Sequence, residues 1–467
     1  MSDLRLQPKR RPVLDTAFLP AVLWNRAYRE RVRAAPGSLP LAIALRRPDG
    51  CCFVHETRIL PPAPEHDALT RTYVERLVKF LLWQKGGSRI VVGGSEPVAR
   101  MLADDYRPGG ARAFDVDIVG RKMFLDTMAV ESVPLDRVPA PQEPAIALGR
   151  HLEGCRIGFD LGGSDRKCAA VVDGRVVHAE EIAWDPYFQK DPRYHYDGVM
   201  DSLRRAAAKL PRVDAIGGSA AGVYVNNEVR VASLFRGVAP DDFERHVRTM
   251  FLRMRKEWND VPFEVVNDGE VTALAGSMSM RDNAVLGVSM GTSQAAGYVT
   301  PHGTITVCLN ELAFAPIDYR PDAPADEWSG DIGCGVQYFS QQGVARLAPL
   351  AGFAFPAGTK PADQLVEVQK AMAAGDARAR RLYETIGTCF GYAVAHYADL
   401  YPDMRNLLVL GRVTSGEGGE VILAEAGQVL REEFPPLAER IRLRTPDEQD
   451  KRHGQAIAAA SLPAIGG

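Results

Sequence analysis

Five consecutive residues at positions 160–164, Asp-Leu-Gly-Gly-Ser, combine a carboxylate, two glycines and a hydroxyl at the end of an apolar run. Glycine has no Cβ, so backbone N–H groups in such a turn can approach a phosphate closely. A carboxylate just before the glycines could help to hold Mg²⁺, which carries the phosphates of a substrate. The stretch is therefore a candidate phosphate-binding turn, although a hairpin can use the same residues for its shape alone.

Two more strand-like runs lead into glycines. Residues 285–290 precede Gly291 and Thr292, and residues 407–410 precede Gly411. A helical stretch lies before the last run, with apolar residues at every third or fourth position from 382 to 397. Three strand-then-glycine elements, separated by helical stretches, indicate two α/β lobes that close on a nucleotide.

A fourth apolar strand, residues 263–266, ends in Asn267, Asp268 and Gly269. A carboxylate at the end of a strand, facing a cleft, is where phosphoryl transfer needs a general base. The alternative is an Asx turn, in which these residues cap the following helix. The phosphate-type turns on either side favour a catalytic role for Asp268.

The first part of the chain predicts a separate α/β segment. Two strands, 41–45 and 53–59, flank a Pro-Asp-Gly turn and form a hairpin. A helix is expected to begin at Asp67 and to end at Gly86, before a buried strand over 90–92. Residues 134–150 are rich in proline and lack apolar periodicity, so we interpret them as a linker.

After the linker the pattern starts afresh. Strands are expected over 157–161, 168–172 and 175–178, with a two-residue turn at Asp173-Gly174. This predicts a three-stranded antiparallel start, with the glycine pair at its first connection. The hairpin over residues 41–59 weakly resembles the later hairpin around Asp173-Gly174. Either the two arose by duplication, with a degenerate first copy, or they are similar by chance.

The composition limits the class of protein. With 467 residues the chain is expected to form two or three domains. It is 46% hydrophobic and 25% charged, and its net charge of -3 predicts no general attraction to nucleic acid or anionic membranes. No apolar run approaches the roughly 18 residues that span a bilayer. The first residues have no apolar stretch typical of a signal peptide. Seven scattered cysteines favour reduced thiols and a cytoplasmic location.

Five ordered motifs from residue 151 onward resemble the ROK family of sugar kinases, which have the actin, hexokinase and Hsp70 ATPase fold. The motifs read DLGGS, GGSAAGVYVNNEV, VVNDGEVTALAG, MGTSQAAGYV and LVLGRVTSGEGG, and the tail GQAIAAASLPA resembles the closing helix of the family. The resemblance covers about two thirds of the chain. It implies an α/β, two-lobed actin-like (ribonuclease H-like) ATPase fold, here preceded by an extra N-terminal α/β domain.

The resemblance also implies roles for single residues. Asp268 would be the general base, and Asp160 would help to hold Mg²⁺ through the phosphates of ATP. The other nucleotide-binding residues would be Gly162, Gly163, Ser164, Gly291, Thr292 and Gly411. The acceptor sugar would contact Ser219, Gly222, Asn267 and Glu311.

The chain departs from the family on the acceptor side. The family usually has Glu-x-Gly-His where this chain has Glu311 followed by Leu-Ala-Phe, so Phe314 replaces a histidine that often binds structural zinc. Its cysteine-rich motif retains only Cys334, and Val336 stands where a sugar-binding glutamate is expected. Zinc needs about four ligands, so no zinc site is expected.

The expected organisation is an N-terminal α/β module (1–133), a linker (134–150), a first kinase lobe (151–266), a second kinase lobe (267–445) and a C-terminal helix (446–467) that packs back on the first lobe. We predict an ATP- and Mg²⁺-dependent kinase of a sugar or polyol, cytoplasmic and homodimeric, with no nucleic-acid or membrane partner. The alternatives are a non-catalytic ligand sensor or transcriptional regulator of the same family, and a kinase of a non-carbohydrate acceptor. The basic run 9–11 is interpreted as a solvated tail rather than a DNA-binding arm.

Overall fold

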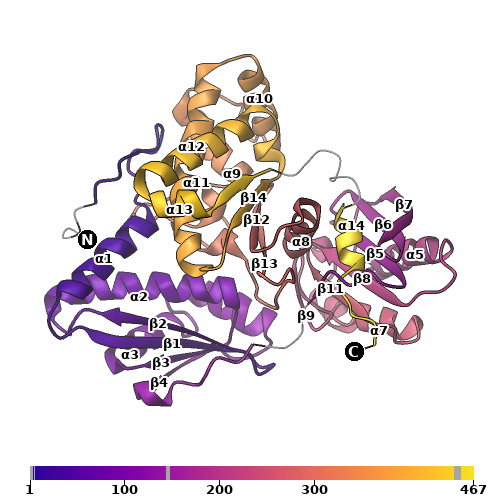
Figure 1. Ribbon diagram of the computed structural model, residues 1–467, viewed down its shortest axis with the longest axis horizontal. Coiled ribbons are helices and arrows are strands. Elements are labelled where there is room, and N and C mark those ends of the chain that lie inside the picture. The colour runs from indigo at the N-terminus through magenta and orange to yellow at the C-terminus, as the bar shows by residue number, and fades with distance from the viewer. Residues whose placement is uncertain (1–3, 5, 144–147, 446–453, 467) are drawn as a thin grey trace. The chain divides into compact units, whose positions relative to one another are not determined.

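The computed structural model describes residues 4, 6–143, 148–445 and 454–466 (Figure 1). The chain forms two compact units. Unit 1 contains Met1–Pro144, Ser289–Ala295 and Cys308–Arg444, and unit 2 contains Ala145–Val288, Ala296–Val307 and Thr445–Gly467. This division differs from the expected one, because the N-terminal module is not a unit of its own and residues 267–288 group with unit 2.

The five-stranded sheet of unit 2 has the strand order β11-β8-β5-β6-β7 (Figure 1). β5, β6 and β7 are consecutive antiparallel strands, which confirms the predicted three-stranded start. β8 is parallel to β5, and β11 is parallel to β8. The bounds are Cys155–Leu161 (β5), Asp165–Val172 (β6), Arg175–Ala183 (β7), Ala215–Ala220 (β8) and Phe263–Asn267 (β11).

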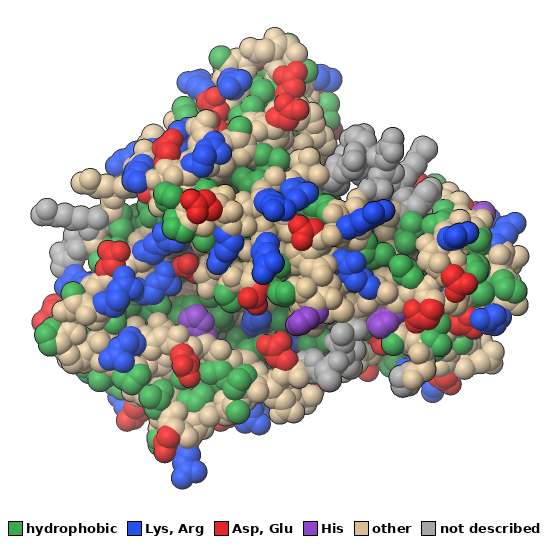
Figure 2. Space-filling model, viewed as in Figure 1, with side chains coloured by type: hydrophobic (Ala, Val, Ile, Leu, Met, Phe, Trp, Pro, Cys, Tyr) green, Lys and Arg blue, Asp and Glu red, His purple; other side chains and the backbone are tan. Residues whose placement is uncertain are grey.

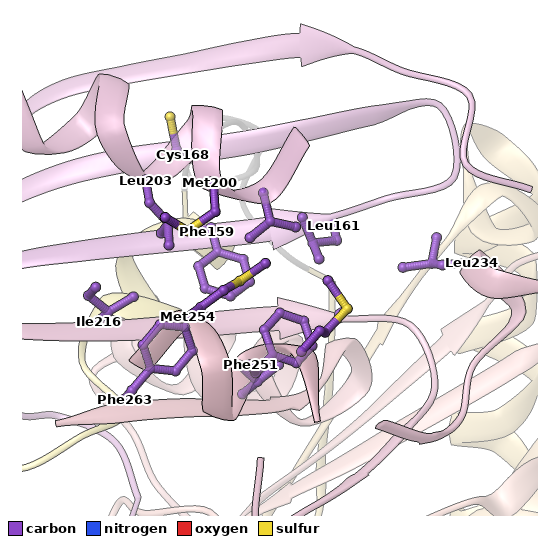
Figure 3. Close-up of a cluster of buried hydrophobic side chains, with 14 of the residues drawn as sticks. Phe159, Leu161, Cys168, Met200, Leu203, Ile216, Leu234, Phe251, Met254 and Phe263 are labelled. Atoms are coloured by element: carbon purple, nitrogen blue, oxygen red, sulfur yellow. The ribbon is translucent and has the colours of Figure 1, made fainter. Parts of the chain in front are cut away.

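One face of this sheet is covered by α5 (Pro192–Ala207) and α7 (Met250–Glu257). Side chains alternate between the two faces of a strand, and Ile157, Phe159 and Leu161 of β5 all lie in this core. Figure 3 shows Phe159 among the labelled aromatic and methionine side chains of the cluster. Asp160 therefore lies on the opposite face of β5.

The C-terminal helix α14 (Gly454–Ala460) covers that opposite face. Gly158 and Gly217 are paired in the sheet, and a Cβ on either would lie 1.7 Å from a carbonyl oxygen of α14. Only glycine permits this close packing of helix on sheet. α14 also packs against α8 (Asp268–Met280), which explains why α8 belongs to unit 2. Residues 446–453 of the expected C-terminal helix lie outside the described residues.

The N-terminal module contains a four-stranded sheet of order β2-β1-β3-β4. The predicted hairpin is confirmed, and its two strands pair antiparallel. Along β2-β1-β3-β4 neighbouring strands are antiparallel, antiparallel and parallel, the same directions as along β7-β6-β5-β8 of unit 2. The order along the chain differs, because β3 follows its hairpin whereas β5 precedes β6 and β7. The bounds are Leu39–Arg46 (β1), Cys52–Ile59 (β2), Arg89–Gly93 (β3) and Ala129–Val133 (β4).

Helix α2 (Pro64–Lys85) is the long helix of this module. It begins three residues before the predicted Asp67, because Pro64 fits the first position of a helix. It ends before Gly86, as predicted, where φ is 81°. Every residue from 77 to 84 is buried, including Lys79 and Gln84, so this part of α2 is enclosed on all sides.

The rest of unit 1 contains most of a second four-stranded sheet and a group of helices. The sheet has the order β13-β12-β14-β15, with bounds Val285–Met290 (β12), Gln294–Val299 (β13), Asn406–Leu410 (β14) and Arg442–Arg444 (β15). The apolar stripe from 382 to 397 lies on α11, as predicted. The helices are α9 (Gln341–Ala351), α10 (Pro361–Ala373), α11 (Ala377–Leu400), α12 (Glu417–Glu433) and α13 (Pro435–Arg440).

The remaining elements are shorter or connect these layers. They are α1 (Ala21–Ala34), α3 (Glu96–Asp105), α4 (Ala113–Asp115), α6 (Pro240–Asp242), β9 (Val223–Val225), β10 (Glu228–Val231) and the helical turns Val116–Met123, Leu135–Arg137, Ser233–Phe235, Phe243–Val247, Leu312–Phe314, Gly335–Gln337 and Arg412–Thr414. All seven cysteines are free thiols. Across the described part of the chain, no helix combines the length and apolarity needed to cross a membrane.

The basic run near the N-terminus is not a solvated tail, which corrects the sequence-based interpretation. The Arg10 guanidinium forms ion pairs with Glu425 at 2.6 Å and Glu432 at 3.0 Å, both on α12. The Lys9 backbone N–H donates to the carboxylate of Glu433. Opposite charges on α12 therefore hold Arg10 against unit 1, and Lys9 is held through its backbone N–H, whereas the Arg11 side chain is exposed.

Candidate active site

The carboxyl ends of three parallel strands in unit 2 bring several predicted site residues to one edge of the sheet. In the strand register Asp160 lies beside Ser219, and Ala220 lies beside Asn267. The Ser219 hydroxyl donates a hydrogen bond to Asp160 Oδ1 at 2.7 Å. Asp268 follows Asn267 directly, so the predicted base and the predicted phosphate-turn carboxylate come from the two strands, β11 and β5, that flank β8.

Asp160 is a buried carboxyl, with 6% of its surface exposed. Burial raises the pKa of Asp160, while the Ser219 hydroxyl and the charge of Lys167 oppose that rise. A buried carboxylate at a glycine-rich turn is suited to Mg²⁺, which is commonly held by one or two carboxylates together with substrate phosphates. Asp160 therefore fits the role that the resemblance implies.

Lys167 is a candidate functional residue that sequence reasoning missed. It pairs with Asp160 across β5 and β6, and its Nζ lies 3.3 Å from Asp165 Oδ1. The Ser164 hydroxyl donates to the other oxygen of Asp165 at 2.9 Å. A cation is thus fixed beside the turn where phosphates are expected. The hairpin register around residues 162–165 was the signal that could have identified it.

The turn at 162–165 is held in place by its neighbours. The Gly162 N–H donates to the Asp165 carbonyl at 3.0 Å, and the Trp184 indole N–H donates to the Gly162 carbonyl at 2.8 Å. A Cβ on Gly163 would lie 2.1 Å from the Tyr187 hydroxyl oxygen. A side chain at 163 would therefore have to displace the Tyr187 ring, and a fixed turn of this kind is prepared for a ligand before it binds.

Asn267 is the residue that caps α8. Its Oδ1 accepts a hydrogen bond from the Gly269 N–H at 2.7 Å, and its Nδ2 donates to the Gly222 carbonyl at 2.7 Å. The capping alternative therefore applies chiefly to Asn267. An amide retains a second N–H and a second lone pair after these bonds, so contact of Asn267 with a sugar hydroxyl stays a prediction.

The Asp268 carboxyl is half-buried at the first position of α8. Burial, together with the nearby charge of Asp160, raises the pKa of Asp268 to about 6 from an ordinary value of 3.8. The Gly269 N–H donates to Asp268 Oδ1 at 3.0 Å and lowers the pKa, but by less. A base with a pKa near the working pH is effective, because it is ionised and still accepts a proton readily.

Unit 1 brings together the other two glycine turns. The Gly291 N–H donates to the Ser293 carbonyl at 2.9 Å, which closes a tight turn that contains Thr292. Gly411 has φ 105°, and a Cβ on it would lie 2.5 to 2.7 Å from backbone atoms of Met290. The turns at 291–293 and 411 are thus in direct backbone contact.

The turn contact gives a prediction for Gly411→Ala. The new methyl group would collide with the Met290 backbone and displace both turns, so ATP affinity is expected to fall at least about tenfold. Gly416→Ala is the matched control, since Gly416 also has positive φ (74°) but no atom lies within 4 Å of its Cβ position. Titration calorimetry with a non-hydrolysable ATP analogue compares the two; equal losses would mean that strain alone, not the contact, matters.

The predicted residues therefore fall into two groups. Unit 2 holds Asp160, Gly162, Gly163, Ser164, Ser219, Gly222, Asn267 and Asp268, and unit 1 holds Gly291, Thr292, Gly411 and Glu311. Glu311 lies at the start of a short helical turn, and its backbone N–H donates to the Trp83 carbonyl on α2 at 2.9 Å. Among the described residues no cluster of three or more His, Cys, Asp or Glu side chains is arranged to hold a metal ion.

Comparisons with known proteins identify the fold. No family model and no curated protein matches the sequence. Among solved structures, a ROK hexokinase from Thermus thermophilus is 20% identical with a TM-score of 0.51, and the match covers 66% of this chain and 96% of the hexokinase. A ROK family transcriptional regulator, a homologue of the E. coli MLC protein, is 18% identical with a TM-score of 0.50, and the match covers 67% of this chain and 78% of the regulator.

The matched two thirds of the chain therefore has the fold of a ROK hexokinase and of a ROK regulator, the actin-like fold that the sequence motifs predicted. Both kinds of protein share the fold, so the choice between them depends on the site.

Proposed function

We propose that this chain transfers the γ-phosphoryl group of ATP to a hydroxyl group of a sugar or polyol, with Asp268 as the general base. The observation that carries the proposal is the Asp268 carboxyl at the carboxyl end of β11, whose pKa is raised to about 6 by burial and by the charge of Asp160. A sensor that only binds a ligand has no need for a base of this kind. A kinase needs one, because the attacking hydroxyl loses its proton.

In the proposed mechanism, ionised Asp268 accepts a hydrogen bond and then the proton from the acceptor hydroxyl. The Gly162-Gly163-Ser164 turn binds ATP phosphate oxygens, and Lys167 adds positive charge there. Asp160 would hold Mg²⁺ through the phosphates, and the ion would neutralise phosphate charge. The turns at Gly291, Thr292 and Gly411 would orient the nucleotide. Positioning and charge stabilisation account for most of the acceleration in such reactions.

The regulator is the second candidate, because one similar structure is a ROK transcriptional regulator. Three features favour the kinase. The N-terminal module has a four-stranded mixed sheet rather than a compact three-helix DNA-binding domain. Arg10 and Lys9 are engaged with acidic residues of α12. On the face drawn in Figure 2, acidic side chains are interspersed among the basic ones, rather than excluded from a continuous basic stripe.

An acceptor screen tests the proposal. ADP formation is measured with ATP and Mg²⁺ over hexoses, amino sugars, polyols and non-carbohydrate alcohols, and the product of any active acceptor is identified by mass spectrometry. We expect ADP formation that depends on a sugar or polyol. Specific, salt-dependent binding to a DNA operator, with no acceptor-dependent ADP, would favour the regulator instead.

The raised pKa of Asp268 predicts the pH dependence. The base must be ionised, so kcat/KM for the acceptor is expected to fall tenfold per pH unit below about pH 6 and to level off above it. Steady-state assays at saturating ATP measure this profile. A profile with its acid limb near pH 4, the ordinary range of an aspartate, would assign the base to another group.

We also propose a cytoplasmic location, which the seven free thiols support.

A further inference from the structure

Five charged residues of the N-terminal module are gathered around α2. Arg76 Nε lies 2.7 Å from Glu75, Lys79 Nζ lies 3.1 Å from Asp115, and Arg112 contacts Glu75 as well. The five comprise three cations and two carboxylates, so the module alone carries one excess positive charge there. A buried charge without a partner is costly, which means that the module requires a further carboxylate.

Asp331, from the acceptor-side part of unit 1, supplies that carboxylate. Its side chain lies 2.9 Å from Lys79 Nζ, 2.7 Å from Arg112 Nη1 and 3.5 Å from Arg76 Nη2. Burial would raise the pKa of Asp331, but these three cations hold it well below its usual range. Burial would likewise lower the pKa of Lys79, yet Asp115 and Asp331 raise it. The six residues form what we call the buried ion cluster.

A second set of contacts joins α2 to the residues around Glu311. The Trp83 and Gln84 carbonyls accept hydrogen bonds from the N–H groups of Glu311 and Asn310, each at 2.9 Å. The Trp83 ring lies 4.3 Å from the Phe314 ring. The Trp83 indole N–H also donates to Asp115 at 3.0 Å, which links this contact to the ion cluster. The C-terminal end of α2 therefore sets the backbone position of Glu311.

The position where phenylalanine replaces the motif histidine and the one cysteine that the motif retains both lie in this interface. Phe314, where the related kinases usually carry histidine, is buried against Trp83. Cys334 is fully buried, its Sγ lies 3.6 Å from Asp331 and 3.5 Å from the Phe314 carbonyl, and burial strongly raises the pKa of its thiol. A zinc site built on Cys334 would need about three further ligands, and neither Phe314 nor Val336 can supply one. The residues present therefore suit packing rather than metal coordination.

We propose that the N-terminal module braces the acceptor-side segment 310–334 in place of a metal ion, with Lys79, Trp83 and Arg112 as positioning residues for acceptor binding. The part that concerns acceptor binding rests on the proposed function, because it depends on Glu311 as an acceptor contact. The bracing of segment 310–334 by the module does not depend on the proposed function. The brace explains why the module belongs to the same compact unit as the turns at 291–293 and 411, rather than forming a separate domain.

Three variants test the brace. Asp331→Asn leaves one excess positive charge in the cluster, Lys79→Met leaves one excess negative charge, and the double variant restores neutrality. Lys370→Met is the control, because Lys370 forms an exposed ion pair with Glu367 on α10 of the same unit. Hydrogen exchange of peptides from 310–334 measures order in the segment without any need for activity. Urea unfolding midpoints measure stability, and kinetics on an active acceptor measure KM for acceptor and for ATP.

The brace predicts that each single variant accelerates exchange in 310–334 at least about tenfold while the β5 and β8 peptides stay unchanged. The double variant should be more stable than either single variant, because the two charge changes compensate. Acceptor KM should rise at least about tenfold in the singles, with ATP KM within about twofold of the original. A chelator should leave the wild-type unfolding midpoint unchanged.

Unchanged exchange in both single variants would overturn the proposal. So would a double variant no more stable than the singles, or a wild-type protein that a chelator destabilises. Failure of the wild type to phosphorylate any acceptor would refute the proposed function alone, since the exchange and unfolding data would still decide on the brace. If a single variant does not fold, folding of the double variant supports the charge coupling, and equal failure of all three contradicts it.

Discussion

Replacement of Asp268 by asparagine is expected to lower kcat for acceptor phosphorylation by about 10³-fold or more, since general bases contribute up to about 10⁴-fold. Asparagine is nearly isosteric with aspartate and still accepts a hydrogen bond, but it cannot take up the proton of the attacking hydroxyl. ATP affinity should be unchanged, because the assigned nucleotide contacts are at the glycine turns. Single-turnover kinetics and calorimetry with an ATP analogue measure the two effects separately.

The same substitution should stabilise the folded chain. Because the folded-state pKa of Asp268 is raised, its ionised form is disfavoured in the folded state at pH values above about 6. Removing that charge is therefore expected to raise stability by about 1–3 kcal/mol at neutral pH, and by less at acidic pH, where the carboxyl is protonated anyway. Glu264→Gln, in the preceding strand β11, is the comparison: burial also raises the pKa of Glu264, so this variant should stabilise the chain without a loss of activity. A less active variant that is also less stable would indicate a misfolded site rather than a missing base.

The second large effect is expected for Asp160→Asn, with kcat lowered by about 10²-fold or more because charge stabilisation near the phosphates is weakened. This substitution should also change the pH dependence of the activity that remains. The charge of Asp160 contributes to the raised pKa of Asp268, so its removal lowers that pKa and shifts the acid limb of the kcat/KM profile to lower pH.

Asp165→Asn provides the comparison for this shift. Asp165 lies in the same glycine turn but is not among the causes of the raised Asp268 pKa, so its replacement should leave the acid limb near pH 6. Profiles of both variants and the wild type are recorded under one set of conditions. An acid limb in Asp160→Asn that coincides with that of the wild type would show that the two carboxyls are not coupled.

Much of the site could be predicted because its signals are local. The strands that contain Asp160 or lead into Asp268, Gly291 and Gly411 are apolar runs and were predicted, whereas β8, which carries Ser219, was not. The grouping of Asp160, Ser219 and Asn267 follows from the parallel pairing of β5, β8 and β11. Lys167 was missed because its position depends on the exact pairing across a hairpin.

The part that could not be predicted depends on contacts between distant segments. Glu75, Lys79 and Arg112 resemble ordinary surface charges in the sequence, and only the fold shows that Asp331 joins them in a buried cluster. The limits of the two units could not be predicted either, because α8 and α14 pack together although they are far apart in the sequence. For the same reason the docking of Arg10 on α12 could not be foreseen.

The central claim, that Asp268 serves the transfer of a phosphoryl group to an alcohol, is tested most directly by following the group itself. Wild type and Asp268→Asn are incubated with γ-labelled ATP, Mg²⁺ and the best acceptor, and label is measured in the acceptor and in inorganic phosphate. We predict that the wild type transfers label to the acceptor in proportion to ADP formed and that the variant transfers almost none. Equal transfer by the two proteins, or label released only as inorganic phosphate by the wild type, would contradict the account.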